Sequence, residues 1–323
     1  MERREFIKRV GGAAAAVVGA GAGALLLHNR PVLDGPKHAT LPSYAIELGT
    51  GDPRMSVVTG TDVPRMVAAG FDGMGGIAKF VQRDDVVLVK ANVAFDRPPM
   101  LAATTRPEVL HAVVMQCREA GARKVIVADN PINQPASSFF KSGIKQAAEE
   151  AGAEIVYPYP SEFEELYIGG ETLTTTWPMF YGPFKRATKV IGVAPLKDHN
   201  LCHASMTMKN WYGLLGGGRN RFHQDIHGII SDFPHMMKPT LVVLDGTRIL
   251  TRNGPTGGSL SDVAEGNTLV MGVDMVAVDA YGYDLLRRIR GSGPDTLDYL
   301  EQAHARGLGN RDWRSLNVKE ARV

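Results

Sequence analysis

The sequence predicts an α/β fold, with a mainly parallel sheet and helices on both of its faces, in a single large domain. Short apolar runs typical of buried strands alternate with stretches of helical period, which is the pattern of successive β-α-β units. The chain has 323 residues, of which 44% are hydrophobic and 22% are charged. These are ordinary values for a globular chain with a buried core. The pattern leaves open a division of the domain into two lobes.

Apolar runs predict the strands. Residues 86–90 read Val-Val-Leu-Val-Lys, and such an uninterrupted run is typical of a strand that is covered on both faces. Further strands are expected at residues 125–129, 154–157, 189–196, 241–245 and 268–273. Parallel neighbours joined by helical crossovers then form the sheet.

Helices are predicted between these strands. Thr105-Arg106-Pro107-Glu108 has the pattern of a capping box with proline in the first turn, and Gly121 is expected to end that helix. Further helices are expected at residues 137–151, 205–215, 275–289 and 295–305. Their apolar residues recur at helical spacing and face the sheet.

The first residues resemble an export signal. Arg3-Arg4-Glu5-Phe6-Ile7-Lys8 resembles the twin-arginine consensus, and an Ala- and Gly-rich run follows it at residues 10–27. An ordinary membrane anchor is the alternative. We therefore expect a twin-arginine signal peptide at 1–30, a linker at 31–51 and the α/β domain at 52–323. The expected location is periplasmic or extracellular, reached through the twin-arginine translocase, and membrane-anchored if the signal stays uncleaved.

Charge and cysteine content exclude several classes of protein. The formal net charge is +2, which gives no basic excess for binding nucleic acid. Cys117 and Cys202 are the two cysteines of the chain, too few for an internal iron–sulfur cluster or a four-cysteine zinc site. A disulfide between them is left open.

Polar residues follow the predicted strands and are candidates for a site. In parallel α/β sheets, ligands bind beyond the carboxyl ends of the strands. We predict catalytic roles there for Asp129 and Asp245, and substrate binding by Lys90, Asn92 and Lys197. Solvated loop charges are the alternative interpretation for each of them.

Histidines gather between residues 199 and 227, where four of the nine in the chain are found. His199 and His203 are four residues apart, as are His223 and His227, and Asp225 lies between the second pair. These five residues are predicted to bind a divalent metal, Zn, Fe or Ni, because imidazole and carboxylate suit such ions. Hydrogen-bonded loop histidines, or bases that act without metal, are the alternatives.

The same segment contains a candidate anion site. Lys209, Arg219 and Arg221 surround Gly216-Gly217-Gly218, whose backbone amides can approach a phosphate or carboxylate closely. We predict that the two arginines bind substrate and that Lys209 is catalytic, by stabilising charge that develops in the reaction. A flexible glycine turn with solvated arginines is the alternative.

An ordered series of motifs resembles one family. The series consists of Val87-Leu88-Val89-Lys90-Ala91-Asn92, the helix start at Thr105, Val125-Ile126-Val127-Ala128-Asp129-Asn130-Pro131, Thr207-Met208-Lys209-Asn210 with Gly213, Asp245-Gly246 and Gly254-Pro255. Together they resemble the family called domain of unknown function 362, over roughly residues 55 to 320. The resemblance implies an α/β fold and makes Lys90, Asn92, Lys209 and Asn210 the preferred site residues, with Asn210 binding substrate. Many relatives carry ferredoxin-like cysteine clusters, which imply redox surroundings, but this chain lacks those clusters.

These observations lead to two hypotheses of function. The first is an exported enzyme that acts on a small anionic substrate, either as a metal-dependent hydrolase or as an oxidoreductase. The alternative is a non-catalytic periplasmic binding protein, or a subunit of a membrane redox complex with a membrane redox partner.

Overall fold

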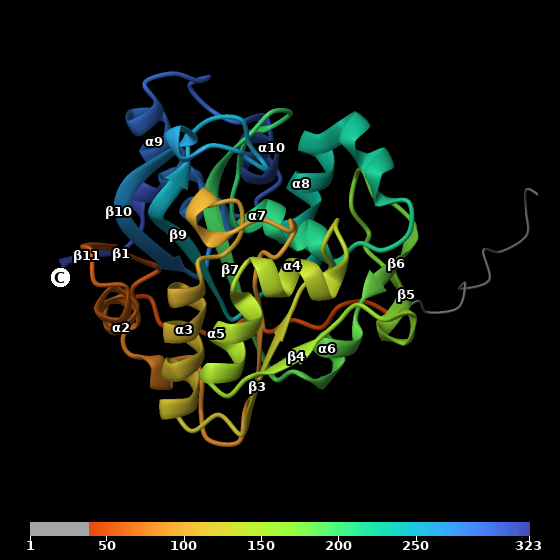
Figure 1. Ribbon diagram of the computed structural model, residues 1–323, viewed down its shortest axis with the longest axis horizontal. Helices are drawn as coiled ribbons and strands as arrows, with labels where there is room; N and C mark the ends of the chain where they lie inside the picture. The colour runs from red at the N-terminus through yellow and green to blue at the C-terminus, as the bar shows by residue number, and fades with distance from the viewer. Residues whose placement is uncertain (1–38) are drawn as a thin grey trace, which may run out of the picture. The chain divides into compact units, whose positions relative to one another are not determined.

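The computed structural model describes residues 39–323 (Figure 1). The predicted twin-arginine signal lies outside the described residues, as does the first part of the predicted linker. Tyr44, in the rest of that linker, is buried, and its hydroxyl donates a hydrogen bond to the carbonyl of Phe184. In the described part of the chain, no helix has the length and hydropathy needed to cross a bilayer.

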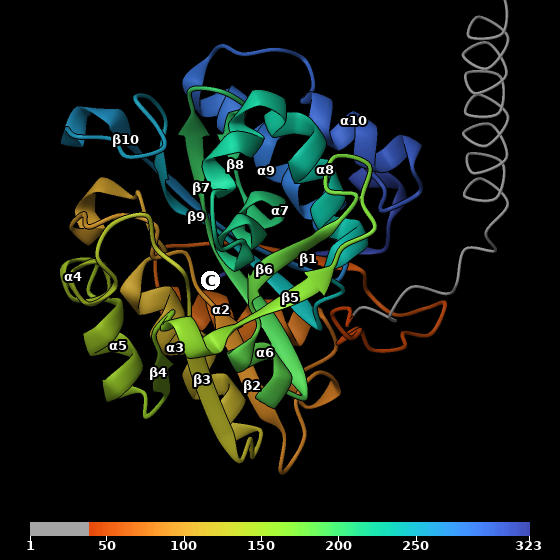
Figure 2. The ribbon, with the colours of Figure 1, turned by 90° about the vertical axis from the view of Figure 1, so that its right-hand side faces the viewer.

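The main sheet has nine strands within the described residues, in the order β11-β1-β10-β9-β7-β2-β3-β4, with β8 paired to β7. The strands are β1 (Met55–Thr59), β2 (Val86–Lys90), β3 (Lys124–Ala128), β4 (Glu154–Val156), β7 (Lys189–His199), β8 (His203–Ser205), β9 (Leu241–Leu250), β10 (Val263–Gly272) and β11 (Val318–Arg322). A separate antiparallel ribbon consists of β5 (Phe163–Tyr167) and β6 (Thr176–Phe180), which lie in front of the main sheet in Figure 2.

The strands from β4 through β3, β2 and β7 to β9 are all parallel to their neighbours. β10 is antiparallel to both β9 and β1. The predicted fold class, α/β with a mainly parallel sheet, is therefore confirmed. The register places Leu88 opposite Ile126 on one side and Val190 on the other, so β2 lies in the interior of the sheet.

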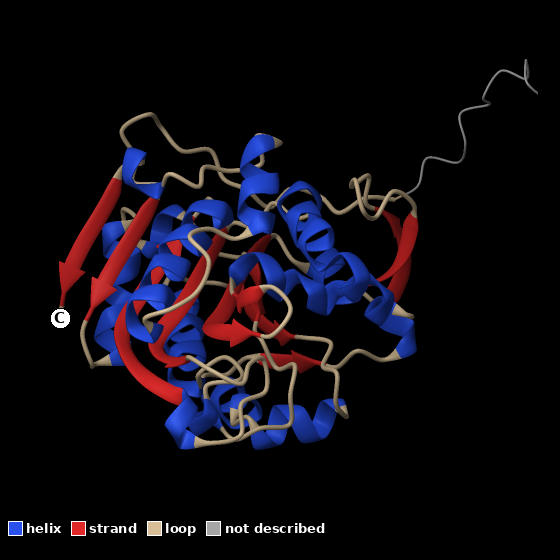
Figure 3. Cartoon of the chain, turned by 90° about the horizontal axis from the view of Figure 1, so that it is seen from above, coloured by secondary structure: helices blue, strands red, loops and turns tan. Residues whose placement is uncertain are grey.

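Helices cover both faces of the sheet, as predicted (Figure 3). The helices are α2 (Val63–Gly73), α3 (Pro107–Glu119), α4 (Pro135–Lys141), α5 (Ile144–Glu150), α6 (Gly182–Arg186), α7 (Thr207–Asn210), α8 (Ile226–Met236), α9 (Met275–Arg290) and α10 (Asp298–Ala305), and the 3₁₀ turns next to the site are η4 (Trp211–Leu214) and η5 (Arg219–Asp225).

Each face has its own hydrophobic core. In β2, Val87 and Val89 pack with α2, α3 and α5, while Leu88 belongs to the core under α8, α9 and α10. This alternation follows from the two-residue period of a strand, and it explains why β2 is apolar at every position but the last. Cys117 and Cys202 belong to opposite cores, and both are free thiols.

Two predicted helices differ from the structure. The stretch 137–151 forms two short helices, α4 and α5, because Gly143 between them adopts a positive φ of 74°. The helix expected at 205–215 shortens to α7 and continues as the 3₁₀ turn η4. Both segments have the apolar pattern of a helix, but the local backbone geometry makes the helices shorter than that pattern predicts.

The predicted capping box at Thr105 is wrong. The N-cap of α3 is Arg106, which makes no side-chain capping bond. The Thr105 hydroxyl instead accepts the backbone N–H of Asn92 and donates to the carbonyl of Val193. It therefore ties the segment after β2 to β7, next to the site.

Two strands extend beyond their predicted ends. β7 continues to His199 and β9 continues to Leu250, past the charged residues that were expected to end them. Lys197 and Asp245 consequently lie within strands, because paired backbone continues beyond the apolar run.

Candidate functional site

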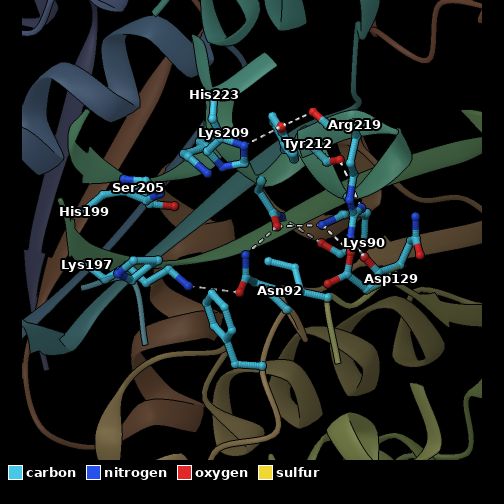
Figure 4. Close-up of a pocket in the computed structure, with 17 residues that line it drawn as sticks. Lys90, Asn92, Asp129, Lys197, His199, Ser205, Lys209, Tyr212, Arg219 and His223 are labelled. Carbon is cyan, nitrogen blue, oxygen red and sulfur yellow. Dashed lines mark hydrogen bonds and ion pairs between the residues drawn. The ribbon is translucent and has the colours of Figure 1, made fainter. Parts of the chain in front are cut away.

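A cavity of about 140 Å³ lies at the carboxyl ends of β2, β3 and β7 (Figure 4). The chain leaves β2 for β3 and β4 on one side, and later adds β7 on the other side of β2. This reversal of strand order is the position at which open parallel sheets bind ligands, because the connections that follow the two neighbouring strands diverge there.

Seven of the nine predicted catalytic and substrate-binding residues line this cavity, which we call the lysine cavity. They are Lys90, Asn92, Asp129, Lys197, Lys209, Asn210 and Arg219. Asp245 and Arg221 do not line it. Its further lining residues are Ala94, Phe95, Asn130, Ile132, His199, Ser205, Tyr212, Gly213, His223 and Pro255.

Lys90, the last residue of β2, forms a buried ion pair with Asp129. The Lys90 Nζ lies 2.8 Å from Asp129 Oδ1, and both side chains are 2% exposed. Asp129 follows β3 directly, and its Oδ2 accepts the backbone N–H of Val93 at 2.6 Å. Burial lowers the pKa of Lys90, and the Asp129 carboxylate opposes that shift. The pair therefore fixes one amine at the base of the cavity with its charge compensated.

Gly213 is required for this packing. A Cβ atom at that position would lie 2.3 Å from Asp129 Oδ1 and 2.9 Å from Lys90 Nζ. Atoms cannot approach so closely, so a side chain here would force the ion pair apart. The glycine that follows the Thr207-Met208-Lys209-Asn210 motif thus has a steric role in the site.

Asn210 braces the site from α7. Its Oδ1 accepts hydrogen bonds from Lys90 Nζ at 2.7 Å and from Asn92 Nδ2 at 3.2 Å. Its Nδ2 donates to the carbonyls of Lys90 and Val193. The Asn210 amide therefore already has partners on both atoms, and it joins α7 to β2 and β7.

Lys197 has no carboxylate partner among the described residues. Its Nζ donates to the carbonyl of Ala103 at 2.5 Å and to Asn92 Oδ1 at 3.2 Å. Burial, together with the nearby cation of Lys209, lowers the pKa of Lys197 to about 7. The ring centroid of Phe95 lies 5.1 Å from the same Nζ. The amine is held in place while its charge is uncompensated.

Lys209 lies in α7 and is less constrained. Its Nζ lies 4.9 Å from the ring centroid of Tyr212, and no described residue accepts a hydrogen bond from it. Burial lowers the pKa of Lys209, and the cation of Arg219 adds to that effect. The Tyr212 hydroxyl donates to the carbonyl of Arg219, which fixes the ring.

The position of α7 depends on Asp279, a buried residue of α9. Its Oδ1 accepts the backbone N–H of Thr207 at 2.8 Å and the Thr207 hydroxyl at 2.5 Å. Its Oδ2 accepts the N–H of Met208 at 2.9 Å. A helix of four residues cannot hold itself in place, so this carboxylate sets the direction of Lys209 and Asn210.

The two predicted arginines have other partners. The Arg219 guanidinium donates to the carbonyls of Asn130, Pro131 and Leu215, and so clamps η5 onto the loop after β3. Arg221 packs its guanidinium 4.2 Å from the ring centroid of Trp177, away from the lysine cavity. Arg219 therefore lines the lysine cavity with part of its guanidinium engaged by backbone carbonyls, whereas Arg221 lies outside the cavity.

Asp245 was expected in the site and is not there. It lies inside β9, and its Oδ1 accepts the N–H of Thr247 at 2.9 Å and the Thr247 hydroxyl at 2.6 Å. Burial raises the pKa of Asp245. Because β9 continues past this residue, the carboxylate is held within the sheet and does not reach the cavity.

The predicted metal ligands do not converge. His199 and His223 line the lysine cavity, but His203 faces His199 across the β7–β8 pair and does not line it. Asp225 is the N-cap of α8 and accepts the N–H of Gly228. His227 stacks on Tyr299 with ring centroids 6.0 Å apart.

Within residues 39–323, no group of three or more His, Cys, Asp or Glu side chains is placed to hold a metal ion. Neither pair of histidines shares a helix face, as the four-residue spacing had predicted. His199 ends one strand and His203 begins the next, while His223 and His227 lie in different elements. We therefore assign no metal to these five side chains. A bound divalent metal stays a prediction, which metal analysis of the purified protein would test.

His199 is a neutral imidazole. Its Nδ1 accepts the backbone N–H of Leu201 at 3.2 Å, which places the ring proton on Nε2. Burial and the neighbouring lysines lower the pKa of His199 to about 2. His223 Nδ1 lies 3.0 Å from the carbonyl of Asn220 and 3.2 Å from the Tyr212 hydroxyl.

Five cavity residues, Ala94, Phe95, Ile132, Ser205 and Tyr212, were not singled out from the sequence. Phe95 and Ser205 lie on segments that follow β2 and form β8, and no local pattern distinguishes them. Tyr212 comes shortly after the Thr207-Met208-Lys209-Asn210 motif, and its place beside Lys209 is the signal that could have revealed it.

Comparison with known proteins adds three findings. A family model described as Domain of unknown function (DUF362) matches residues 87–284. The "Thylakoid-associated protein sll1697" of Synechocystis sp. is 27% identical over 230 residues, which cover 66% of this chain and 67% of that protein. A crystal structure of a Thermotoga maritima protein aligns with a TM-score of 0.38 and 10% identity, covering 71% of this chain and 59% of the other.

Proposed function

This chain belongs to the family described as Domain of unknown function (DUF362), and we propose that its lysine cavity binds a small anionic substrate. We propose further that the protein is an enzyme acting on that substrate. The residues matched by the family, 87–284, contain the whole cavity. The support comes from the chemistry of the cavity and not from the family, whose description states no reaction.

Uncompensated positive charge is the observation that carries this proposal. Four lysine and arginine side chains line the lysine cavity, and Asp129 is the one acidic side chain among its lining residues. Asp129 pairs with Lys90, which leaves Lys197 and Lys209 without a carboxylate. Buried charges without partners are costly, so a bound anion would offset that cost.

The size of the cavity and a proton-exchanging group that lines it support a small substrate and an enzyme. Its volume of about 140 Å³ accommodates a carboxylate or phosphate with few further atoms. Lys197, with its pKa of about 7, lines this space. A group that can take up and release a proton near neutral pH is characteristic of catalytic sites.

We propose further that the protein is exported. The Arg3-Arg4 pattern supports a twin-arginine route, with a periplasmic or extracellular destination. The Synechocystis relative is named as a thylakoid-associated protein, which supports a location at a membrane. Retention of the full-length chain by the membrane after export would identify an uncleaved signal.

Anion binding is expected to stabilise the protein against heat. At a ligand concentration of about one hundred times the dissociation constant, the gain is about 2.7 kcal/mol. Thermal melts with sulfate, phosphate, acetate and small carboxylates measure it. Lys197→Met is expected to abolish the shift while leaving the melting temperature without ligand equal or higher, because a buried, uncompensated cation is replaced by an apolar chain of similar length.

Lys145→Met is the matched control. Lys145 is a solvent-exposed lysine of α5 with a long ion pair to Glu149, and its replacement is expected to leave the anion shift unchanged. If no anion in the panel raises the melting temperature of the unmodified protein, or if Lys197→Met keeps the full shift, the anion site is refuted.

The affinity for an anion of constant charge, such as sulfate, is expected to fall as the pH rises above 7. Lys197 is protonated below its pKa of about 7 and neutral above it, and the anion favours the protonated form. By linkage, the dissociation constant rises by up to about tenfold per pH unit above that pKa. Titration calorimetry between about pH 6 and pH 9, on either side of that pKa, measures this slope.

Lys197→Arg tests the assignment, because arginine stays charged throughout this range. Its slope is expected to be shallower than that of the unmodified protein. Lys90, Lys209 and His223 face the same space and are unchanged in this variant, so the difference between the two slopes reports on Lys197. An affinity that is equal at the two ends of the pH range would contradict the prediction.

A further inference from the structure

The three lysines of the cavity differ in how their amines are held. Lys90 Nζ has two partners, Asp129 and Asn210, and Lys197 Nζ has two partners, Ala103 and Asn92. Lys209 Nζ has no acceptor among the described residues and lies over the ring of Tyr212. Two amines are thus fixed in position, and the third is free to react.

The two fixed amines are arranged to hold an anion. An ammonium group has three N–H donors, so Lys90 and Lys197 each keep one donor for a ligand. Lys90 ends β2 and Lys197 lies in the neighbouring strand β7, so both are anchored in the centre of the sheet. Two donors from adjacent strands suit the two oxygens of a carboxylate.

Lys209 approaches the same space from a different element. It lies in α7, which Asp279 fixes from α9, and it lines the cavity together with Lys90 and Lys197 (Figure 4). A carboxylate held by the strand lysines would therefore place the atoms next to it within reach of the Lys209 amine. Burial and the Arg219 cation favour the neutral form of that amine, which is the form that attacks carbon.

From this arrangement, and resting on the proposed anion site, we propose that Lys209 is a nucleophile that forms an imine with the carbonyl carbon of a small oxo-carboxylate. The substrate class is a carboxylate with a ketone or aldehyde close to it. Lys90 and Lys197 bind its carboxylate, and the Tyr212 ring packs against the Lys209 amine.

The step balances without a further reagent. The Lys209 lone pair forms a C–N bond, and the electron pair of the C=O bond moves to oxygen, which takes a proton. The carbinolamine then loses its hydroxyl as water, and the nitrogen loses its second proton as the C=N bond forms. In total, one amine and one carbonyl give one imine and one water, with no change of oxidation state.

Reductive trapping tests the proposal. The purified full chain is incubated with glyoxylate, the smallest oxo-carboxylate, and cyanoborohydride, and peptide mass mapping locates the modified lysine. The expected result is selective modification of Lys209, at least about tenfold faster than that of exposed Lys145, because the bound carboxylate holds the carbonyl carbon beside the Lys209 amine. Excess sulfate is expected to slow the reaction at Lys209 and not at Lys145.

Two variants separate the possible results. Lys209→Arg keeps the positive charge and cannot form an imine, so it is expected to lose the adduct and keep the sulfate-induced thermal shift. Lys197→Met is expected to lose the shift and to slow trapping at Lys209, because the carboxylate is no longer held.

The inference is overturned if Lys209 reacts no faster than Lys145, or if the adduct forms on Lys197 instead. If sulfate stabilises the unmodified protein while Lys209 is not selectively trapped, the nucleophile is refuted and the anion site stands. If sulfate and the other anions give no shift, the proposed function itself fails.

Discussion

Replacing Asp129 by alanine is expected to lower the free energy of unfolding by about 3–5 kcal/mol. The substitution leaves the Lys90 ammonium buried without a carboxylate, and it removes the acceptor of the Val93 N–H. Both groups are then deprived of partners in a place that water reaches poorly. Chemical denaturation of the purified variant measures the loss.

The double variant Lys90→Met with Asp129→Asn is expected to recover most of that stability. Methionine removes the unpaired charge, and the amide oxygen of the introduced asparagine can still accept the Val93 N–H. Glu164→Ala breaks an exposed ion pair with Lys185 and is expected to cost less than about 1 kcal/mol. If Asp129→Ala is as mild as Glu164→Ala, the buried pair does not have the role assigned to it.

Asp279→Ala is expected to destabilise the protein by a similar amount, about 3–5 kcal/mol, and also to abolish anion binding. The substitution leaves the N–H groups of Thr207 and Met208 without acceptors, and each buried unpaired group costs about 1–3 kcal/mol. Because α7 carries Lys209 and Asn210, its displacement also disturbs the cavity. Denaturation and the anion-induced thermal shift measure the two effects separately.

Asp284→Ala is the matched control on the same helix. Its carboxylate accepts a hydrogen bond from Trp313 Nε1 and pairs with Arg314, and it has no contact with α7 in the described structure. A loss of about 1 kcal/mol or less, with the anion shift retained, is expected. An Asp279→Ala variant that keeps a normal anion shift would show that α7 does not depend on this carboxylate.

The cavity shows how one residue type takes several roles in one small space. Lys90 is compensated by a carboxylate, Lys197 is held by neutral oxygens, and Lys209 contacts an aromatic ring. These partners decide which amine has a compensating carboxylate, which one titrates near neutral pH and which one has no hydrogen-bond acceptor. The chemistry of the cavity therefore depends on its hydrogen-bonding partners more than on the number of lysines.

The positions of polar residues at the sheet edge were predicted correctly where the strand ends at the same point as its run of apolar residues. β2 begins and ends as expected, and Asp129 follows β3, so Lys90 and Asp129 emerge at the same edge of the sheet. Asp245 was misplaced because β9 continues as paired backbone through polar residues. A run of apolar residues indicates which side chains are buried. It does not indicate where the strand ends, because backbone hydrogen bonding can continue through the polar residues that follow.

The predicted histidine cluster shows the limit of spacing arguments. A separation of four residues brings side chains together only on a helix. His199 and His203 face each other across two strands, and His227 is turned towards Tyr299 by α8. The spacing of the histidines along the chain therefore could not show whether their side chains lie close enough together to bind one metal ion.

The sequence by itself determined the α/β class, the inner strands and the candidate lysines, because apolar periodicity and the order of polar residues along the chain are local properties. Only the tertiary structure decided that Lys197 lacks a carboxylate, that Gly213 makes room for an ion pair, and that Asp279 directs Lys209. The physical reason is that charge compensation depends on distances between residues far apart in the chain, and these distances exist only once the sheet and its helices have packed.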